Sequence, residues 1–480
     1  MKKSTTPSLP LKLAFIPIAI LVFLLSYNVW VYGDDALSGS NQFILLIGGA
    51  AAALVGFRNG TSYKTMLTKV ADNIHAVTGA ILILLFVGAL AGTWLISGII
   101  PAMIYYGLQV LHPSIFLPAC VVICAVISVA TGSSWTTSAT VGIALIGIGK
   151  ALGIPVGMVA GAAISGAYFG DKLSPLSDTT NLAPAMAGSD LFTHIRYMLF
   201  TTVPSIVVTL LIFLVLGFIQ NANGVTDTET LLAAIDKKFT INFWLFLVPA
   251  IVIFLIVKKS PPLIALMIGT LLGALFAIVF QQPILLEIVG SKTLSIEEGY
   301  KAVINAITVS TEINTDNALL NDLFSSGGME GMLGTIWLII CAMVFGGIMD
   351  ATGALQSISA VLLNWAQSVF QLFAATVASC LAINLSASDQ FLSIVVPGKM
   401  FEKAYRNRGL APENLSRTLE DSGTVTSVLI PWNTCGAYQS GVLGVSVGEY
   451  FFYAFFNWLS PFMTLLVAAF GIKIRTLHKK

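Results

Sequence analysis

Hydroxyl-bearing side chains gather between two apolar stretches of the chain. Six serines and threonines lie between Thr131 and Ser138, with Gly132 among them. A bilayer offers no water to loose backbone, so a polar break of this kind must line protein or a water-filled cavity. Hydroxyl and carbonyl oxygens are hard ligands, which suit a hard cation such as Na⁺. These hydroxyl groups are therefore candidate cation ligands as a cluster. The alternative is a polar loop at the membrane surface.

A second polar cluster, residues 170–181, adds two carboxylates. Asp171 and Asp178 are seven positions apart, which is one face of a continuous helix, but Pro175 argues against continuity. A buried carboxylate that binds either H⁺ or Na⁺, and never both, makes an exchanger by competition alone. Asp178 is the first choice for this shared group, with Asp171 or Asp421 next.

The same cluster holds further candidate ligands: Ser174, Thr179 and Asn181. We expect Na⁺ to bind at Asp178, Asn181 and Ser133. The alternative is a solvated loop in which Asp178 caps a helix. Lys172 can pair with either aspartate of the cluster or extend to the membrane surface.

The second half of the chain carries comparable groups. Stretch 384–390 lies between apolar segments, and stretch 420–427 begins with two acids. Ionisable residues inside membrane segments usually mark ion or proton pathways. The candidates from this half are Asp389, Asp421, Thr424 and Asn433. For both stretches a solvated loop is the alternative.

The composition decides what kind of elements hold these groups. Of 480 residues only 47 are charged (24 Lys and Arg, 23 Asp and Glu), which is 10% against about 25% in soluble domains. The mean hydropathy is +0.89. These values exclude a soluble globular protein, a disordered chain and a disulfide scaffold. A net charge of +1 gives no footprint for a nucleic-acid partner. The cysteines and histidines match no metal motif, so we expect no cofactor.

Apolar stretches of about 20 residues, the length that crosses a bilayer as a helix, recur along the chain. We therefore expect an all-α polytopic membrane protein. Several spans are short or interrupted by glycine and proline, which predicts broken helices and re-entrant hairpins. The expected spans are 13–32, 42–57, 75–97, 98–112, 114–131, 137–169, 196–219, 241–257, 262–280, 332–350, 353–371, 372–386 and 449–472.

Lysine and arginine orient these spans by the positive-inside rule. Five basic segments belong in the cytoplasm: the N-terminus, 58–69, 258–259, 399–417 and the C-terminal tail. Both termini are then cytoplasmic, and the polar stretches 220–240 and 281–330 lie outside, the second with a short amphipathic helix near 295–308. The expected division is N-terminal membrane helices (1–72), a first repeat with the ion-site motifs (73–220), a helical hairpin with an external loop (221–330) and a second repeat (331–475).

The two halves resemble each other in sequence. Gly98 recurs as Gly353, 255 positions on, and the motif that begins at Asp171 recurs at Asp421, 250 positions on. One copy has five cations in a segment where the other has only Lys150, so the copies would be inverted in the membrane. Inverted repeats with broken helices that meet near the midplane are a common build of secondary transporters.

Several stretches resemble the sodium/proton antiporter family called NhaC, namely 92–108, 131–137, 170–184, 420–424 and 431–433. The resemblance extends from about residue 75 to 465 and implies an acidic motif and a hydroxyl motif at matching positions. The acidic motif is Asp171, Ser174, Asp178, Thr179 and Asn181, and the hydroxyl motif is Ser133, Ser134 and Thr136. The resemblance also implies membership of the ion transporter superfamily, with inverted repeats and re-entrant hairpins, often as homodimers.

The sequence thus predicts a secondary antiporter of a bacterial cytoplasmic (inner) membrane that exchanges Na⁺ for H⁺, in contact with membrane lipid. An enzyme is not expected; the GxGD motif of intramembrane proteases fails because position 168 is Tyr. The family also includes antiporters of Na⁺-lactate and H⁺-malate, so an organic-acid exchanger is the alternative, with Lys172 facing the carboxylate. An uncoupled channel is a further alternative, against which the clustered acids argue.

Overall fold

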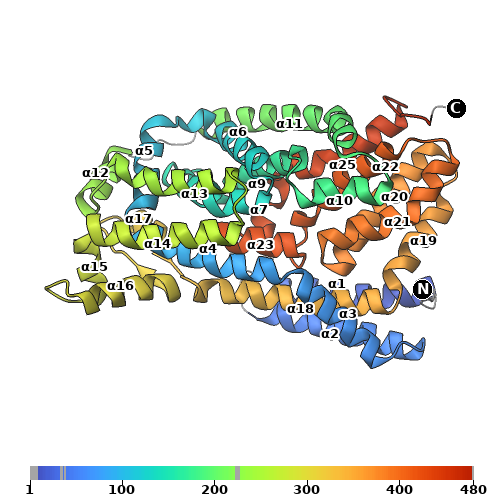
Figure 1. Ribbon diagram of the computed structural model, residues 1–480, viewed down its shortest axis with the longest axis horizontal. Helices are drawn as coiled ribbons and strands as arrows, with labels where there is room; N and C mark the ends of the chain where they lie inside the picture. The colour runs from blue at the N-terminus through green and yellow to red at the C-terminus, as the bar shows by residue number, and fades with distance from the viewer. Residues whose placement is uncertain (1–8, 33–35, 37–38, 222–227, 478–480) are drawn as a thin grey trace.

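Helices make up most of this computed structural model, which describes residues 9–32, 36, 39–221 and 228–477. Most helices run along the longest axis of the molecule (Figure 1). Helices α1 (Leu11–Tyr32), α2 (Ser40–Arg58) and α19 (Ala354–Trp365) lie toward one end, and α12 (Thr228–Lys238), α15 (Gln282–Val289) and α16 (Ile296–Thr308) lie at the other. The expected cytoplasmic termini depend on residues 1–8 and 478–480, which lie outside the described residues.

The remaining elements of the first half include the broken segments of the site. They are α3 (Tyr63–Ala76), α4 (Thr78–Ile96), α5 (Ile99–Val110), α6 (Pro113–Thr131), α7 (Ser134–Thr137), the π-helix η2 (Ser138–Gly142), α8 (Ile143–Ala151), α9 (Val156–Leu173), α10 (Asp178–Ala187) and α11 (Leu191–Asn221).

The middle of the chain is a helical hairpin followed by short elements. They are the 3₁₀ turn η3 (Phe243–Phe246), α13 (Leu247–Val257), α14 (Pro262–Phe280), β1 (Thr311–Glu312), α17 (Ala318–Leu323), β2 (Ser325–Ser326) and η4 (Glu330–Met332). The two strands pair antiparallel, with Thr311 opposite Ser326. Helix α16 matches the expected amphipathic helix, and Ser295 starts it with a capping box completed by Glu298.

The second half again alternates long and broken helices. Its elements are α18 (Leu333–Ala351), α20 (Val369–Ala387), α21 (Gln390–Asn407), α22 (Pro412–Leu419), the π-helix η5 (Glu420–Thr424), η6 (Ser427–Leu429), α23 (Thr434–Leu443), α24 (Val447–Tyr450), η7 (Phe451–Tyr453) and α25 (Phe455–Ala469).

The polytopic all-α fold predicted from the sequence is confirmed. By length and composition, eight described helices can cross a membrane, or up to ten if each of two bent pairs forms one span. The single span expected over 137–169 is wrong. The chain breaks there because Gly153 adopts the left-handed conformation (φ +71°) and Pro155 starts the next helix. The result is two helices, α8 and α9.

Helix boundaries recur at an almost constant spacing. Helix α19 begins 255 positions after α5, while α20, α22 and α23 each begin 256 positions after α6, α9 and α10. The break after α6 at Gly132 recurs 256 positions on, at Ser388, and both residues are left-handed. The spacing of 250 taken from the acidic motifs is therefore wrong for the helices, because Ser427, and not Asp421, lies 256 positions after Asp171.

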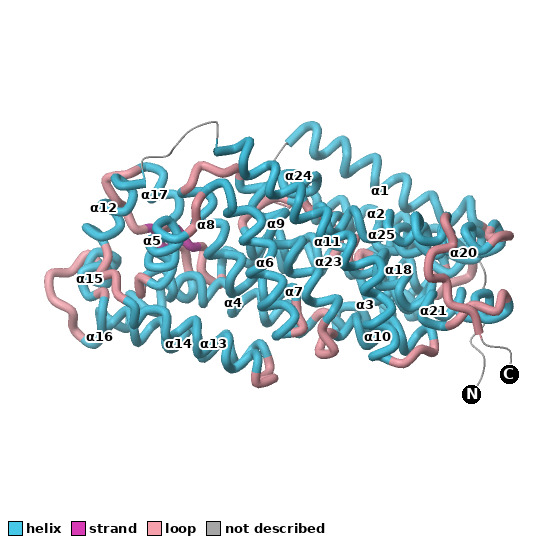
Figure 2. Tube along the Cα trace, turned by 90° about the horizontal axis from the view of Figure 1, so that it is seen from above, coloured by secondary structure: helices cyan, strands magenta, loops and turns pink. Residues whose placement is uncertain are grey.

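Close contact between α6 and α9 fixes the backbone below the site (Figure 2). A Cβ atom added to Gly170 would lie 2.4 Å from the carbonyl oxygen of Ala125. The Ser128 hydroxyl also donates a 2.6 Å hydrogen bond to the carbonyl oxygen of Ala167. Small residues let two membrane helices approach this closely. The C-terminal turn of α9, which carries Asp171 and Lys172, is thereby held in place.

Candidate functional site

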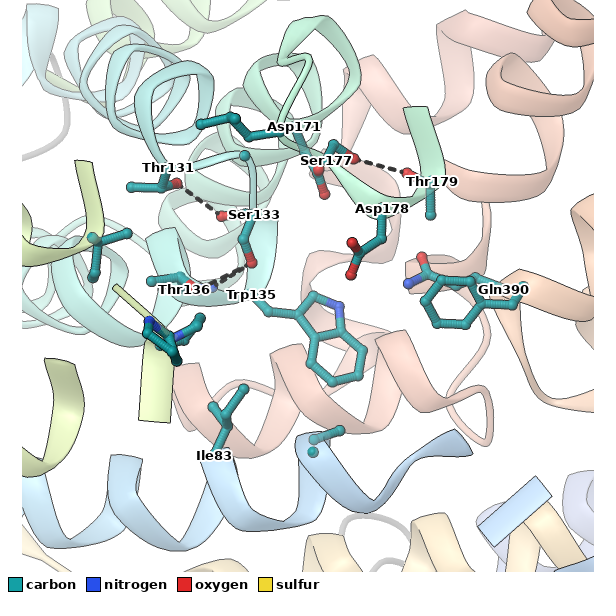
Figure 3. Close-up of a pocket in the computed structure, with 18 of the residues that line it drawn as sticks. Ile83, Thr131, Ser133, Trp135, Thr136, Asp171, Ser177, Asp178, Thr179 and Gln390 are labelled. Atoms are coloured by element: carbon teal, nitrogen blue, oxygen red, sulfur yellow. Dashed lines mark hydrogen bonds between the residues drawn. The ribbon is translucent and has the colours of Figure 1, made fainter. Parts of the chain in front are cut away.

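A cavity of about 550 Å³ opens where four chain breaks meet (Figure 3). The breaks precede helices α7, α10, α21 and α23, two from each half of the chain. These segments contribute Thr131, Gly132, Ser133, Trp135, Thr136, Ser177, Asp178, Thr179, Asp389, Gln390, Phe391 and Thr434. The opposite wall comes from the α3–α4 junction and from residues 259–262 between α13 and α14.

The hydroxyl motif forms one wall of this cavity because the chain must turn there. Gly132 ends α6 in the left-handed conformation, and Ser133 then caps α7. The Ser133 hydroxyl accepts hydrogen bonds of 3.1 Å from both the backbone N–H and the hydroxyl of Thr136. Ser133 and Thr136 both line the cavity, as expected for a polar break between two apolar helices.

Two carboxylates of the first half face the cavity in different environments. Asp171 is 8% exposed and accepts hydrogen bonds from the Ser134 hydroxyl (2.7 Å) and backbone N–H (3.1 Å). Asp178 is exposed in the described chain and extends into the cavity (Figure 3). The cap of α10 is Ser177, so Asp178 is the first helical residue and not the cap proposed from sequence.

A third carboxylate reaches the cavity from the second half. Ser388 ends α20 with φ +60°, and Asp389 caps α21 by accepting a 2.9 Å hydrogen bond from the backbone N–H of Leu392. Asp389 is 5% exposed and lines the cavity. Lys259 also lines it. The charged lining among the described residues is therefore three carboxylates and one ammonium group, which favours a cationic occupant.

Lys172 and Asp421 form a buried ion pair behind the cavity. Both side chains are fully buried, and the Lys172 ammonium group also donates a 2.9 Å hydrogen bond to Ser460. Asp421 accepts a further hydrogen bond from Thr464. From sequence, Lys172 was expected either to pair with Asp171 or Asp178 or to extend to the membrane surface, and both alternatives are wrong. Neither member of the pair lines the cavity.

Besides Asp421, five predicted ligands do not line the cavity: Ser134, Ser174, Asn181, Thr424 and Asn433. The Asn181 amide donates to the carbonyl oxygens of Pro175 (2.9 Å) and Ser177 (2.7 Å), so it shapes the loop between α9 and α10. Asn433 caps α23 by accepting from the backbone N–H of Cys435 (3.1 Å). The side chains of Asn181 and Asn433 thus hold two of the breaks in shape.

Glu420 begins one of the polar stretches found in the sequence, but it was not chosen there as a candidate ligand. It is fully buried, and one carboxylate oxygen accepts a 3.1 Å hydrogen bond from the hydroxyl of Thr179, a cavity residue. A signal was available, since Pro412 is typical of a helix start and Gly423 is the next helix-breaking residue. That pattern predicts a helix, and not a loop, around Glu420.

Arg417 lies on α22, directly before η5. The sequence placed it among the cytoplasmic cations, yet its side chain is fully buried. Its guanidinium group lies 4.5 Å from the ring centre of Tyr197 and 5.9 Å from that of Phe373. Stacking on aromatic faces is a stabilising environment for a desolvated guanidinium group.

Comparison with known proteins places this arrangement in a family. The Na⁺/H⁺ antiporter family matches residues 166–472, which include the C-terminal part of α9, α10 and the second half of the chain through α25. The chain belongs to the Na⁺/H⁺ antiporter family. Its members are transporters and not enzymes, as the sequence analysis expected. All three cavity carboxylates lie within the matched region.

Individual relatives span most of both chains. The Na⁺/H⁺ antiporter NhaC of Alkalihalophilus pseudofirmus is 37% identical, over 88% of this chain and 88% of the relative. The malate-2H⁺/Na⁺-lactate antiporter of Bacillus subtilis is 38% identical, over 90% of this chain and 88% of the relative. A Na⁺/H⁺ antiporter of Haemophilus influenzae that is described as uncharacterized is 34% identical over the full length of both. The solved structure of Neisseria gonorrhoeae MtrF has 16% identity and a TM-score of 0.38.

Proposed function

We propose that this protein exchanges Na⁺ for H⁺ across a bacterial cytoplasmic membrane, with cavity carboxylates that hold either ion in turn. The observation that carries the proposal is Asp178, which projects into a cavity that it shares with Asp171 and Asp389. Membership of the Na⁺/H⁺ antiporter family supports the same exchange. Both termini would lie in the cytoplasm.

The cavity supplies oxygen ligands around Asp178. Ser133 and Thr136 provide hydroxyl groups on one wall, and Thr434 provides another at the start of α23. Na⁺ would bind to Asp178 and Ser133, while Asn181 keeps the loop before α10 in its shape. Protonation of Asp178 removes the negative charge that attracts Na⁺, so H⁺ and Na⁺ compete for one group. No cofactor is required by this scheme.

The recurrent helix spacing supports a further part of the proposal. The two halves would be inverted repeats, so that the breaks at Gly132 and Ser388 approach the cavity from opposite sides of the membrane. Such a site between two similar halves suits alternating access, in which one half moves against the other. The homodimer implied by the family resemblance stays a prediction.

An organic-acid exchanger is the second candidate, because the Bacillus subtilis relative carries malate and lactate. A cavity of about 550 Å³ is also larger than a single Na⁺ requires. Lys172 is not available to bind an organic carboxylate, since its charge is already neutralised by Asp421. Lys259 is the lining cation that would face a carboxylate. Three acids in the same lining favour the cation exchanger.

The test is exchange in proteoliposomes that contain a trapped pH dye. After a pH gradient is imposed, Na⁺, K⁺ or Li⁺ is added, each with and without malate and lactate. We expect Na⁺ alone to collapse the gradient and Asp178→Asn to abolish the collapse without unfolding the protein. Asp236→Asn is the matched control, since Asp236 is exposed on α12, away from the cavity.

Two results would change the conclusion. Near-normal exchange by a folded Asp178→Asn variant removes Asp178 from the shared role. Collapse only in the presence of malate or lactate moves the assignment to the organic-acid exchanger. In that case Lys259→Gln should weaken the response to malate, while the Na⁺ requirement stays.

A further inference from the structure

A continuous chain of oxygen atoms extends from the cavity into the protein. The Ser177 hydroxyl lies 3.1 Å from the Thr179 hydroxyl, which donates a 3.1 Å hydrogen bond to one carboxylate oxygen of Glu420. Ser177 and Thr179 line the cavity, but Glu420 does not. This chain joins the start of α10, in the first half, to the π-helix η5 in the second.

Two acids beside this chain each keep one oxygen without a partner. Oδ1 of Asp171 and Oε2 of Glu420 have no hydrogen-bond partner among the described residues, although both atoms are buried. The hydroxyl of Thr424, four residues after Glu420, is likewise buried and unpartnered within the described chain. Buried polar atoms are nearly always satisfied, so each exception calls for a physical explanation. Here several orphaned oxygens occur together.

The charges in this region are also unbalanced. Asp171 and Glu420 are linked through the first turn of α10, because the Thr179 hydroxyl donates to Glu420 and the Thr180 hydroxyl donates a 3.2 Å hydrogen bond to the carbonyl oxygen of Asp171. Lys172 is near, but it is committed to Asp421, which is its ion-pair partner. Arg417, three residues before Glu420, is also buried, but its guanidinium nitrogens have no hydrogen-bond partner among the described residues, so it does not pair with Glu420. Two buried carboxylates without an ion-pair partner in the described part of the chain are costly in a membrane protein. A cation between them would neutralise charge and satisfy the bare oxygens at once.

We propose that Asp171, Thr179 and Glu420 form an inner binding site for the transported monovalent metal cation, behind the cavity that contains Asp178. The ligands are carboxylate and hydroxyl oxygens, which suit a hard cation. Asp178 captures the hydrated ion in the open cavity, and the inner site holds it after dehydration. Because ligands come from both halves, the bound ion ties α9 and α10 to η5.

This inference deepens the proposed Na⁺/H⁺ exchange and rests on it for the identity of the ion. Its test is equilibrium binding of ²²Na⁺ to the purified protein in nanodiscs, which needs no transport. We expect Glu420→Gln to raise the Na⁺ dissociation constant about tenfold or more, since an ionic ligand is lost. Glu402→Gln is the matched control, because Glu402 pairs with Arg406 away from the cavity. It should bind Na⁺ within about twofold of the wild type.

A second pair of variants tests the inner site if the Glu420→Gln protein does not fold. Thr179→Ser keeps the hydroxyl and should bind Na⁺ like the wild type, whereas Thr179→Val should bind several-fold more weakly. Unchanged Na⁺ affinity in a folded Glu420→Gln protein overturns the inner site. This holds even if the pH dependence of Na⁺ binding changes in the variant, because Glu420 would then bind only a proton and not Na⁺. If the wild type binds ²²Na⁺ but moves no H⁺, the proposed exchange fails while the site can still be tested.

Discussion

Removal of one member of the Lys172–Asp421 ion pair should destabilise the protein strongly. Both side chains are fully buried, and Asp421 would keep only the hydroxyl groups of Ser460 and Thr464 after Lys172→Met. Breaking a buried pair leaves an uncompensated charge and typically costs about 3–5 kcal/mol. Asp421→Asn should cost a similar amount, because it strands the lysine. The pair also joins α9 to η5, so the loss acts across both halves.

A double-mutant cycle measures this coupling. The combined Lys172→Met and Asp421→Asn variant has no buried charge to compensate, so we expect it to be more stable than either single variant. The free energy of unfolding is read from SDS titration in mixed micelles. Lys301→Met is the control, because the Lys301–Glu297 pair is exposed and should leave the midpoint unchanged. Additive effects of the two single variants would refute a direct pairing of the two charges.

Three further outcomes follow from the same structure. Ser133→Ala should weaken the apparent affinity for Na⁺ by about 1–2 kcal/mol, because one hydroxyl ligand is lost. The affinity is measured as the Na⁺ concentration that half-saturates exchange, and an unchanged value would count against Ser133 as a ligand. Gly170→Ala should lower the free energy of unfolding by about 1–3 kcal/mol, because the new Cβ atom would lie 2.4 Å from the Ala125 carbonyl oxygen. Gly79→Ala is the control and should leave it unchanged, because a Cβ atom at Gly79 meets nothing within 4 Å. The backbone N–H of Thr193 holds the pKa of Asp190 below its ordinary value, so the stability lost in Asp190→Ala should be present at pH 7 and shrink below about pH 4. Thermal unfolding at both pH values checks this, and a difference that grows in acid would contradict it.

The membrane fold was predictable because it rests on local properties of the chain. Apolar stretches of membrane-spanning length are visible in the sequence, and so is the break at Gly132, which ends α6 through its own backbone preference. The break before Pro155 was missed, although proline is typical of a helix start. The hydroxyl motif at Ser133 and the acidic motif at Asp178 were found in the same way. Both motifs occur at breaks between apolar helices, where polar groups need a cavity.

The pairing between the two halves was not predictable from these motifs. The acidic motifs suggested a spacing of 250, but the helices repeat at 255–256. The two values differ because Asp171 and Asp421 lie at different distances from the starts of α9 and α22. That error favoured Asp421 as a counterpart of Asp171, although Asp421 neutralises Lys172. A partner 249 positions away is chosen by packing, which no local pattern reports.

By itself, therefore, the sequence determined the class of protein, the break at Gly132 and some of the polar residues that line the cavity, including Asp178. These features follow from hydropathy and from residues with restricted backbones. Only the tertiary structure decided which acids face the cavity, which are neutralised, and that Glu420 contacts Thr179 from the other half. The physical reason is that charge compensation inside a membrane protein depends on distances between helices, and these distances are set when the two halves pack together.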